Sequence, residues 1–208
     1  MELSLAFIVF VLVSAFTPGP NNIMIMASGL NYGVARSLPH LMGITLGVPS
    51  MFLVVGLVLA WPLQNIPWLR PAVQLLGIVY LFYLAWLVAS ADSNLSQADA
   101  ENTSKPLTFF QAALFQWVNP KAWMLGAGAL GVFVDSDTSL VSQIVIMSIV
   151  FSLSALPSAG TWMLFGSALA SLFNNPARRK WFNYSMGILL IASVMPAVLD
   201  LVAQYSSH

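Results

Sequence analysis

Two short clusters of Pro, Asn and other polar residues interrupt apolar runs in this sequence. They are Thr17-Pro18-Gly19-Pro20-Asn21-Asn22 and Gln116-Trp117-Val118-Asn119-Pro120-Lys121. Proline lacks an N–H group and fixes φ, so each cluster predicts a helix break followed by a new helix that begins at proline. The first N–H groups of a helix have no intrahelical partner and lie at the positive end of its dipole. Each cluster can therefore contribute to an anion-binding site.

Lys121 is the most unusual residue of the second cluster. It falls in the first turn of the expected new helix, where the helix dipole disfavours a cation. It also lies inside an apolar span, where insertion of a lysine costs about 2.5–3.5 kcal/mol. A bound anion would relieve both costs, so we predict a carboxylate site formed by the helix N-termini and Lys121. The alternative is that the side chain extends along its apolar stem to the membrane interface.

A zwitterionic amino acid would also need acceptors for its ammonium group. The candidates are carbonyl oxygens freed by the breaks and nearby side-chain oxygens: Ser14, Phe16, Gln116, Thr17, Asn21 and Asn119. Pro157 interrupts a later apolar run, and Ser158 and Thr161 lie beside it. These two residues are candidates to complete the pocket, with ordinary interhelical hydrogen bonds as the alternative.

The composition identifies the class of protein that must position these residues. The chain has 208 residues, of which 59% are hydrophobic and 7% are charged. Soluble domains are about 45–50% apolar and about 25% charged, so the sequence predicts an integral membrane protein. The same values exclude a disordered chain and a nucleic-acid binder, and the absence of cysteine excludes a disulfide-stapled domain.

Apolar runs between the charged residues are long enough to form membrane-spanning helices, which need about 20 residues. We expect spans near residues 3–28, 39–61, 71–90, 108–133, 140–170 and 182–203. The predicted fold class is therefore an all-α integral membrane protein with six transmembrane helices. The first span lacks the basic start of a secretory signal, so we expect it to be retained.

A polar segment at residues 91–107 divides the chain into two three-helix halves, residues 1–90 and 108–208. Three is an odd number, so the second half enters the membrane inverted relative to the first. Inverted repeats with a central site are common in transporters. In this interpretation, the first helix of each half is broken at its Pro/Asn cluster.

Lysine and arginine are unequally divided between the two sides of this topology. One side carries Arg36, Lys105 and the basic cluster 178–180, whereas the other carries only Arg70. The positive-inside rule places the first side in the cytoplasm, together with the polar linker, and both termini in the periplasm. We interpret the cluster 178–180 as a topological anchor, with binding to anionic lipid headgroups as the alternative.

The motifs resemble the LysE/RhtB family of amino-acid exporters over nearly the whole chain. The resemblance rests on the two Pro/Asn clusters, Gly29, Gly33, Arg36, Gly43, Gly47 and the segments 75–81 and 105–109. Within the family, residues 17–23 and Thr161-Trp162 are similar to the cysteine/O-acetylserine exporter subgroup. The resemblance implies a six-helix bacterial inner-membrane protein. It would export neutral amino acids or derivatives such as cysteine and O-acetylserine, driven by the proton gradient.

Few side chains are candidates to carry a coupling proton. No Asp or Glu lies securely inside an expected span, so either Lys121 or the substrate would carry the proton, with His40 as a further candidate. Gly43 and Gly47 form a GxxxG pattern that predicts close helix packing, either within the fold or in a homo-oligomer.

Other function classes fit the sequence poorly. The only histidines, His40 and His208, are not part of an HExxH motif, and no pair of intramembrane aspartates is present. We therefore expect no enzyme activity, no cofactor, no metal and no nucleic-acid partner. The expected partners are an amino-acid substrate and membrane lipid. The remaining alternative is a non-transporting membrane subunit or a channel of the same fold.

Overall fold

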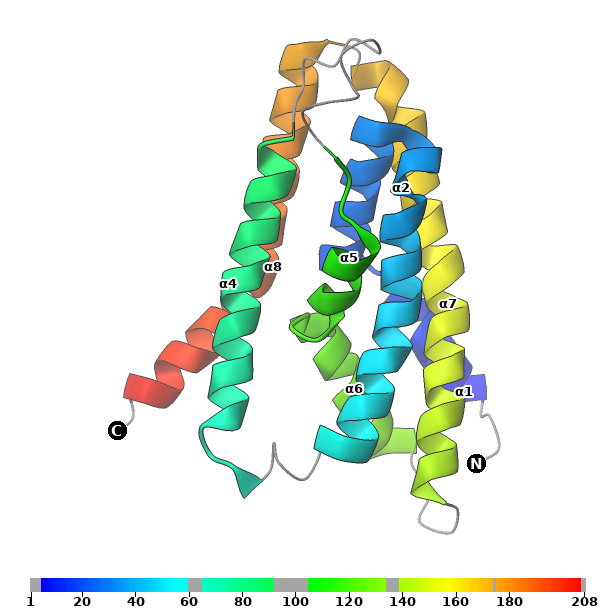
Figure 1. Cartoon of the computed structure of the whole chain (residues 1–208), viewed down its shortest axis with the longest axis vertical. Helices are drawn as coiled ribbons and strands as arrows, with labels where there is room; N and C mark the ends of the chain where they lie inside the picture. Colours follow the sequence, from blue (N-terminus) through cyan, green and yellow to red (C-terminus); the bar gives the residue numbers. More distant parts are fainter. Residues whose placement is uncertain (1–4, 60–64, 92–104, 134–138, 174, 207–208) are drawn as a thin grey trace.

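The computed structural model describes residues 5–59, 65–91, 105–133, 139–173 and 175–206, and every regular element in these ranges is helical (Figure 1). The elements are α1 (Leu5–Phe16), α2 (Pro20–Val54), the π-helix η1 (Val55–Leu59), α4 (Leu69–Ala89), α5 (Phe109–Gln116), α6 (Pro120–Phe133), α7 (Leu140–Leu169), the 3₁₀-helix η2 (Ala170–Phe173) and α8 (Pro176–Ser206). The predicted all-α class is confirmed for this part of the chain. The expected polar linker falls mainly on residues 92–104, which lie outside the described residues.

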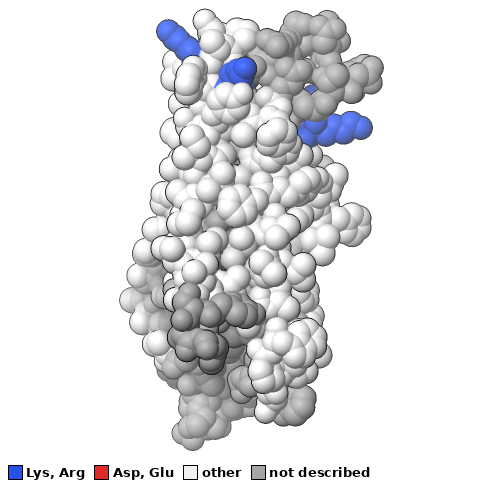
Figure 2. Space-filling model, turned by 90° about the vertical axis from the view of Figure 1, so that its left-hand side faces the viewer, with Lys and Arg blue, Asp and Glu red and all other residues white. Residues whose placement is uncertain are grey.

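Among the described residues, three helices are long and apolar enough to cross a membrane: Pro20–Val58, Pro71–Ala89 and Leu140–Phe173. Large apolar side chains also face outward along the bundle, and Trp86, Leu153 and Ile188 are each about two-thirds exposed. Lysine and arginine side chains gather at one end of the face shown in Figure 2, while the rest of its described surface is uncharged. An apolar exterior with charges at one end is the surface expected of a protein surrounded by lipid.

Both expected helix breaks are present. α1 ends at Phe16 and α2 begins at Pro20, with the extended residue Gly19 at the N-cap. α5 ends at Gln116 and α6 begins at Pro120. Proline suits the first position of a helix because the N–H group that it lacks would have no partner there. The breaks therefore occur where the two Pro/Asn clusters predict them.

The connection between the first two expected spans differs from the prediction. Residues 29–38 are helical except for Gly33, which has φ 74° and ψ 176°. Ser28 and His40 flank this glycine, and their side chains are in contact at 2.8 Å. Twelve residues of continuous helix would separate them by about 18 Å. The helix α2 therefore folds back at Gly33 and consists of a first arm (residues 20–32) and a second arm (residues 34–54) (Figure 1).

The first arm of α2 packs very closely against α7. A Cβ added to Gly29 would overlap the carbonyl of Met163, and a Cβ added to Gly166 would overlap the carbonyl of Met26. The two glycines therefore allow the backbones to approach closely, as small residues do in membrane-helix pairs. This contact fixes the position of the half-helix that begins at the first break.

The second arm of α2 packs against α5 through the predicted GxxxG pattern. A Cβ on Gly43 would overlap the carbonyl of Phe109, and one on Gly47 would lie 2.8 Å from the Cα of Ala113. The expected close packing is confirmed as a contact within the fold. It holds the second arm beside the half-helix that precedes the second break.

Candidate functional site

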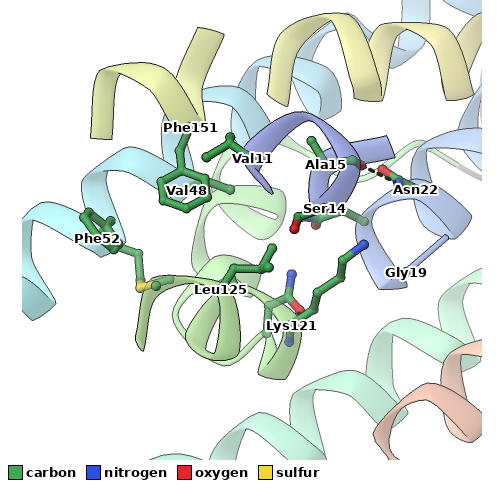
Figure 3. A pocket seen from close by; sticks show the side chains of 15 residues that line it. Val11, Ser14, Ala15, Gly19, Asn22, Val48, Phe52, Lys121, Leu125 and Phe151 are labelled. Atoms are coloured by element: carbon green, nitrogen blue, oxygen red, sulfur yellow. Dashed lines mark hydrogen bonds between the residues drawn. The ribbon is translucent and has the colours of Figure 1, made fainter. Parts of the chain in front are cut away.

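A cavity of about 80 Å³ lies between the two helix breaks (Figure 3). Its polar end is lined by Ser14, Gly19, Asn21, Asn22, Asn119 and Lys121. Its apolar end is lined by Val11, Val48, Met51, Phe52, Leu125 and Phe151. A cavity of this size has room for several water molecules or a small ligand. The contrast between the two ends suits a ligand with a charged group at one end and an uncharged group at the other.

Lys121 extends from the second break to the first. Its Nζ donates to the carbonyl of Thr17 at 2.6 Å and lies 3.3 Å from the hydroxyl oxygen of the same residue. The lysine stem lies directly over Gly19, where an added Cβ would be 2.8 Å from the Cδ of Lys121. The C-terminal end of α1 carries the negative end of a helix dipole, which stabilises the cation there. The ammonium group is therefore held at the polar end of the cavity.

The end of α1 is closed by side chains from two other helices. The Nδ2 of Asn22 donates to the carbonyls of Ala15 and Thr17, both at 2.9 Å. The hydroxyl of Ser158, from α7, donates to the carbonyl of Ala15 at 2.7 Å. These bonds provide partners for carbonyl groups that the end of a helix leaves unpaired, which is costly inside a membrane.

The carbonyls proposed from the sequence as acceptors for a substrate ammonium are other ones, those of Ser14, Phe16 and Gln116. In the structure, the hydroxyl of Thr17 donates to the carbonyls of Val13 and Ser14, at 2.9 and 2.8 Å. Because α1 ends at Phe16, every carbonyl of its last turn needs a partner, and not only the two that precede the prolines by four residues.

A pair of amide side chains, Gln116 fully buried and Asn21 half-buried, joins the two breaks. The Nδ2 of Asn21 donates to the Oε1 of Gln116 at 2.8 Å, and the Nε2 of Gln116 donates to the Oδ1 of Asn21 at 2.9 Å. The Gln116 amide also donates to the carbonyl of Ala112 at 2.9 Å. Gln116 is fully buried, so this pairing fixes the start of α2 against the end of α5.

The two helix N-termini at the cavity differ in their capping. The Oδ1 of Asn119 accepts from the backbone N–H of Lys121 at 3.1 Å, so it caps α6 as the sequence predicts. The N-terminus of α2 has Gly19 as its N-cap and no side-chain cap. The first-turn N–H groups of α2 are therefore the better donors for an anion.

The structure brings together most of the site residues that the sequence indicates. Gly19, Asn21, Asn22, Asn119 and Lys121 line the cavity. Thr17, Gln116 and Ser158 contact these residues or the end of α1, and Pro18, Pro20 and Pro120 shape the breaks. Thr161 lies apart, because its side chain is exposed and its hydroxyl donates to the carbonyl of Pro157 in its own helix at 2.7 Å.

The apolar end of the cavity was not identified from the sequence. Val48, Met51 and Phe52 come from the second arm of α2, Leu125 from α6 and Phe151 from α7. Apolar residues in a membrane span give no signal that separates a cavity wall from a lipid-facing or packed position. Gly126 was missed as well, although an added Cβ there would lie 3.1 Å from the ring of Phe52.

Comparison with known proteins identifies relatives over most of the chain. A family model described as "LysE type translocator" matches residues 12–197. Cysteine/O-acetylserine efflux proteins of Escherichia coli strain K12 and of Shigella flexneri are each 32% identical to the chain over 190 residues, which cover 89% of this chain and 92% of those proteins. No solved structure matches the chain.

Proposed function

The chain belongs to the LysE type translocator family, and from this premise we propose that it exports small neutral amino acids through the cavity between the two helix breaks. Translocators and efflux proteins are transporters, so the chain is an integral membrane transporter and not an enzyme. The observation that carries the proposal is the cavity itself, which has Lys121 and two helix N-termini at one end and apolar side chains at the other.

The substrate carboxylate binds at the polar end in this proposal. It is held by the ammonium group of Lys121 and by the first-turn N–H groups of α2, which has no side-chain cap. In the structure, the Lys121 ammonium donates to the carbonyl of Thr17, so an arriving carboxylate would compete with that carbonyl for the cation.

The substrate ammonium binds at side-chain oxygens of the same end. Ser14, Asn21 and Asn119 line the cavity there, and each carries an oxygen that can accept a hydrogen bond. The carbonyls of Ala15 and Thr17 lie close by but already accept from Asn22. Of the remaining residues proposed from the sequence, Gln116 and Ser158 position this end without lining it.

The substrate side chain faces the apolar end. None of the residues that line the cavity is acidic, so a lysine or arginine side chain would have no ionic partner there. A small uncharged side chain fits both the lining and the cavity volume of about 80 Å³. The relatives named for cysteine and O-acetylserine efflux support substrates of this size, so we propose cysteine and O-acetylserine as the first compounds to test.

The membrane arrangement proposed here has six spans. They are α1 with the first arm of α2, the second arm with η1, α4, α5 with α6, α7 with η2, and α8. Each broken span is the first span of one half of the chain. We propose that the two halves, residues 1–90 and 108–208, are inverted repeats. Arg36, Lys105 and residues 178–180 flank the end of the bundle that holds the Gly33 bend (Figures 1 and 2). This end faces the cytoplasm, and both termini are periplasmic.

Export against a concentration gradient needs an energy source, and we propose exchange for protons across the bacterial inner membrane. The test uses purified protein in liposomes loaded with unlabelled substrate. Uptake of external labelled cysteine or O-acetylserine in exchange for internal substrate (counterflow) should saturate and should be inhibited by other small neutral amino acids but not by lysine.

A channel or a non-transporting subunit predicts a different result in this assay. A channel gives flux that neither saturates nor depends on internal substrate, and a subunit gives none. A matched control is empty liposomes with the same lipid composition. Flux without saturation, or no flux from protein shown to be folded, would contradict the carrier.

A further inference from the structure

His40 is a buried histidine that does not line the substrate cavity. Its side chain is fully buried in the second arm of α2, and its Nδ1 lies 2.8 Å from the hydroxyl oxygen of Ser28. Its Nε2 is also buried, and no described residue forms a hydrogen bond with it. A buried polar atom without a partner is rare in folded proteins and costs stability. An unpartnered Nε2 atom is explained if a second conformation of the protein gives this atom a proton or a hydrogen-bond partner.

The Ser28–His40 contact joins the two arms that line the cavity. Ser28 belongs to the first arm, which begins with Asn21 and Asn22 at the polar end. His40 belongs to the second arm, which carries Phe52 at the apolar end. Because the contact closes the bend at Gly33, a change at His40 acts on the angle between these arms.

The surroundings of His40 contain no group that would neutralise a charge on it. α5 and α7, which pack against α2, carry no ionisable side chain, and no Asp or Glu lies in α1, α2, α4, α5, α6 or α7. α2 itself carries Tyr32 and Arg36, which form a cation–π contact of 5.6 Å with each other. The ionisable side chains described on the other helices packed against α2 are Lys121 of α6 and Arg178, Arg179, Lys180 and Tyr184 of α8.

We infer that His40 is the site at which the transporter binds its coupling proton, with Ser28 holding the second ring nitrogen. The inference rests on the proposed function, since it assigns a residue to the exchange of substrate for protons. The neutral imidazole takes up one proton and later releases it, and no other bond changes. Lys121 is engaged at the substrate end, so of the ionisable side chains described on the two arms and at the cavity, His40 is the one whose ring can gain a proton without disturbing that end.

Proton binding would change the balance between two positions of the arms. The charged ring has two N–H donors, of which Ser28 can accept one, while the other lacks an acceptor in this structure. Burying an unpaired charge is costly, so protonation favours a state in which the arms separate and water reaches the ring. The proton gradient can therefore bias the conformation of the substrate site through His40.

The first test observes the imidazole directly. His40 and His208 are the only histidines of the chain, so a His208→Gln variant with labelled histidine gives a single ring spectrum by NMR in lipid nanodiscs. We expect the His40 signals to titrate between about pH 5 and pH 8, the range in which histidine charge changes are used in proteins, and to shift when cysteine is added. A ring that stays neutral over this range, with and without cysteine, would overturn the inference.

The second test separates proton coupling from substrate binding. With the membrane potential held at zero and one proton exchanged per substrate, a gradient of one pH unit should change the equilibrium substrate ratio of the wild type about tenfold. His40→Gln should keep counterflow and lose this gradient response. The matched control is Thr45→Val, a buried residue of the same arm whose hydroxyl donates to the carbonyl of Leu41 within its own helix, and it should keep both activities.

Three outcomes of the second test would overturn the assignment. One is a full gradient response in His40→Gln. Another is loss of counterflow together with the gradient response in that variant, which would indicate a structural role. The third is wild-type counterflow without any response to the pH gradient. This result would agree with the proposed substrate site and would exclude a coupling proton at His40. Absence of counterflow in the wild type would instead contradict the proposed function as a whole.

Discussion

The ammonium group of Lys121 lies 2.6 Å from the backbone carbonyl of Thr17, although the two residues are 104 positions apart. The lysine belongs to the first turn of α6, where the helix dipole disfavours it, and its ammonium group reaches Thr17, directly after the C-terminal end of α1, where the dipole of another helix favours it. The positive charge of Lys121, at the start of one half-helix, thus stabilises the negative end of the dipole of another half-helix.

A second link between the breaks reinforces this arrangement. Asn21 and Gln116 exchange two hydrogen bonds, so the start of α2 is fixed to the end of α5. A substrate that binds at the polar end of the cavity must share donors and acceptors with these two links. Substrate binding and the relative position of the two broken helices are coupled for this reason.

The amide pair should contribute to stability as a unit. Asn21→Ala leaves the buried Gln116 amide without this partner, and Gln116→Ala leaves the half-buried Asn21 amide without it. Each change should lower the free energy of unfolding by about 1–3 kcal/mol. The double variant should lose less free energy of unfolding than the two single variants together, because it leaves neither amide of the pair without its partner. Unfolding in mixed micelles of mild detergent and dodecyl sulfate measures the three differences. Strictly additive losses would show that the pair does not interact.

Gly33 should tolerate substitution by alanine less well than Gly160, although both glycines have open space around them. A Cβ at Gly33 or at Gly160 would meet no atom within 4 Å, but only Gly33 has a positive φ, of 74°. Gly33→Ala should therefore destabilise the protein by about 1–3 kcal/mol through backbone strain. Gly160→Ala, in the helical part of α7, should be neutral or stabilise it by up to about 1 kcal/mol. Equal effects on thermal unfolding would argue against the bend at Gly33.

Phe52 should limit the size of the transported side chain. Phe52→Ala enlarges the apolar end of the cavity, so the rate of leucine counterflow relative to alanine should rise about tenfold or more, given about 1–3 kcal/mol per methylene group in a hydrophobic pocket. The control is Phe110→Ala, which removes an aromatic ring that is 73% exposed and does not line the cavity. An unchanged ratio in Phe52→Ala would place the substrate side chain elsewhere.

Much of the polar end could be predicted from the sequence, because Pro, Asn and Lys are rare and costly inside membrane spans. The restart at Pro20, the cap at Asn119 and the position of Lys121 in the first turn of α6 follow from rules that act within one turn of a helix. The GxxxG contact at Gly43 and Gly47 follows in the same way, since only small residues permit it.

The remaining features depend on contacts between distant segments. Nothing local distinguishes Phe52 or Phe151 from other apolar residues of a span, so the apolar end of the cavity could not be identified. The pairing of Asn21 with Gln116 joins residues 95 positions apart. The sequence predicts that the first span ends near residue 28 and the second begins near residue 39. In the structure, the chain stays helical on both sides of Gly33, and this single glycine with positive φ reverses its direction.

The most direct measurement of the substrate site compares a free carboxylate with a blocked one. Counterflow of labelled cysteine would be competed with unlabelled cysteine and with cysteine methyl ester, in the wild type and in Lys121→Met, which keeps the apolar stem and removes the charge. A hydrogen bond to a charged group is worth about 1.5–3 kcal/mol, so the wild type should prefer the free carboxylate by about ten- to a hundredfold. Lys121→Met should insert normally, bind the two compounds alike and transport cysteine at a small fraction of the wild-type rate. Normal cysteine transport by this variant, or equal competition by the ester in the wild type, would contradict the carboxylate site.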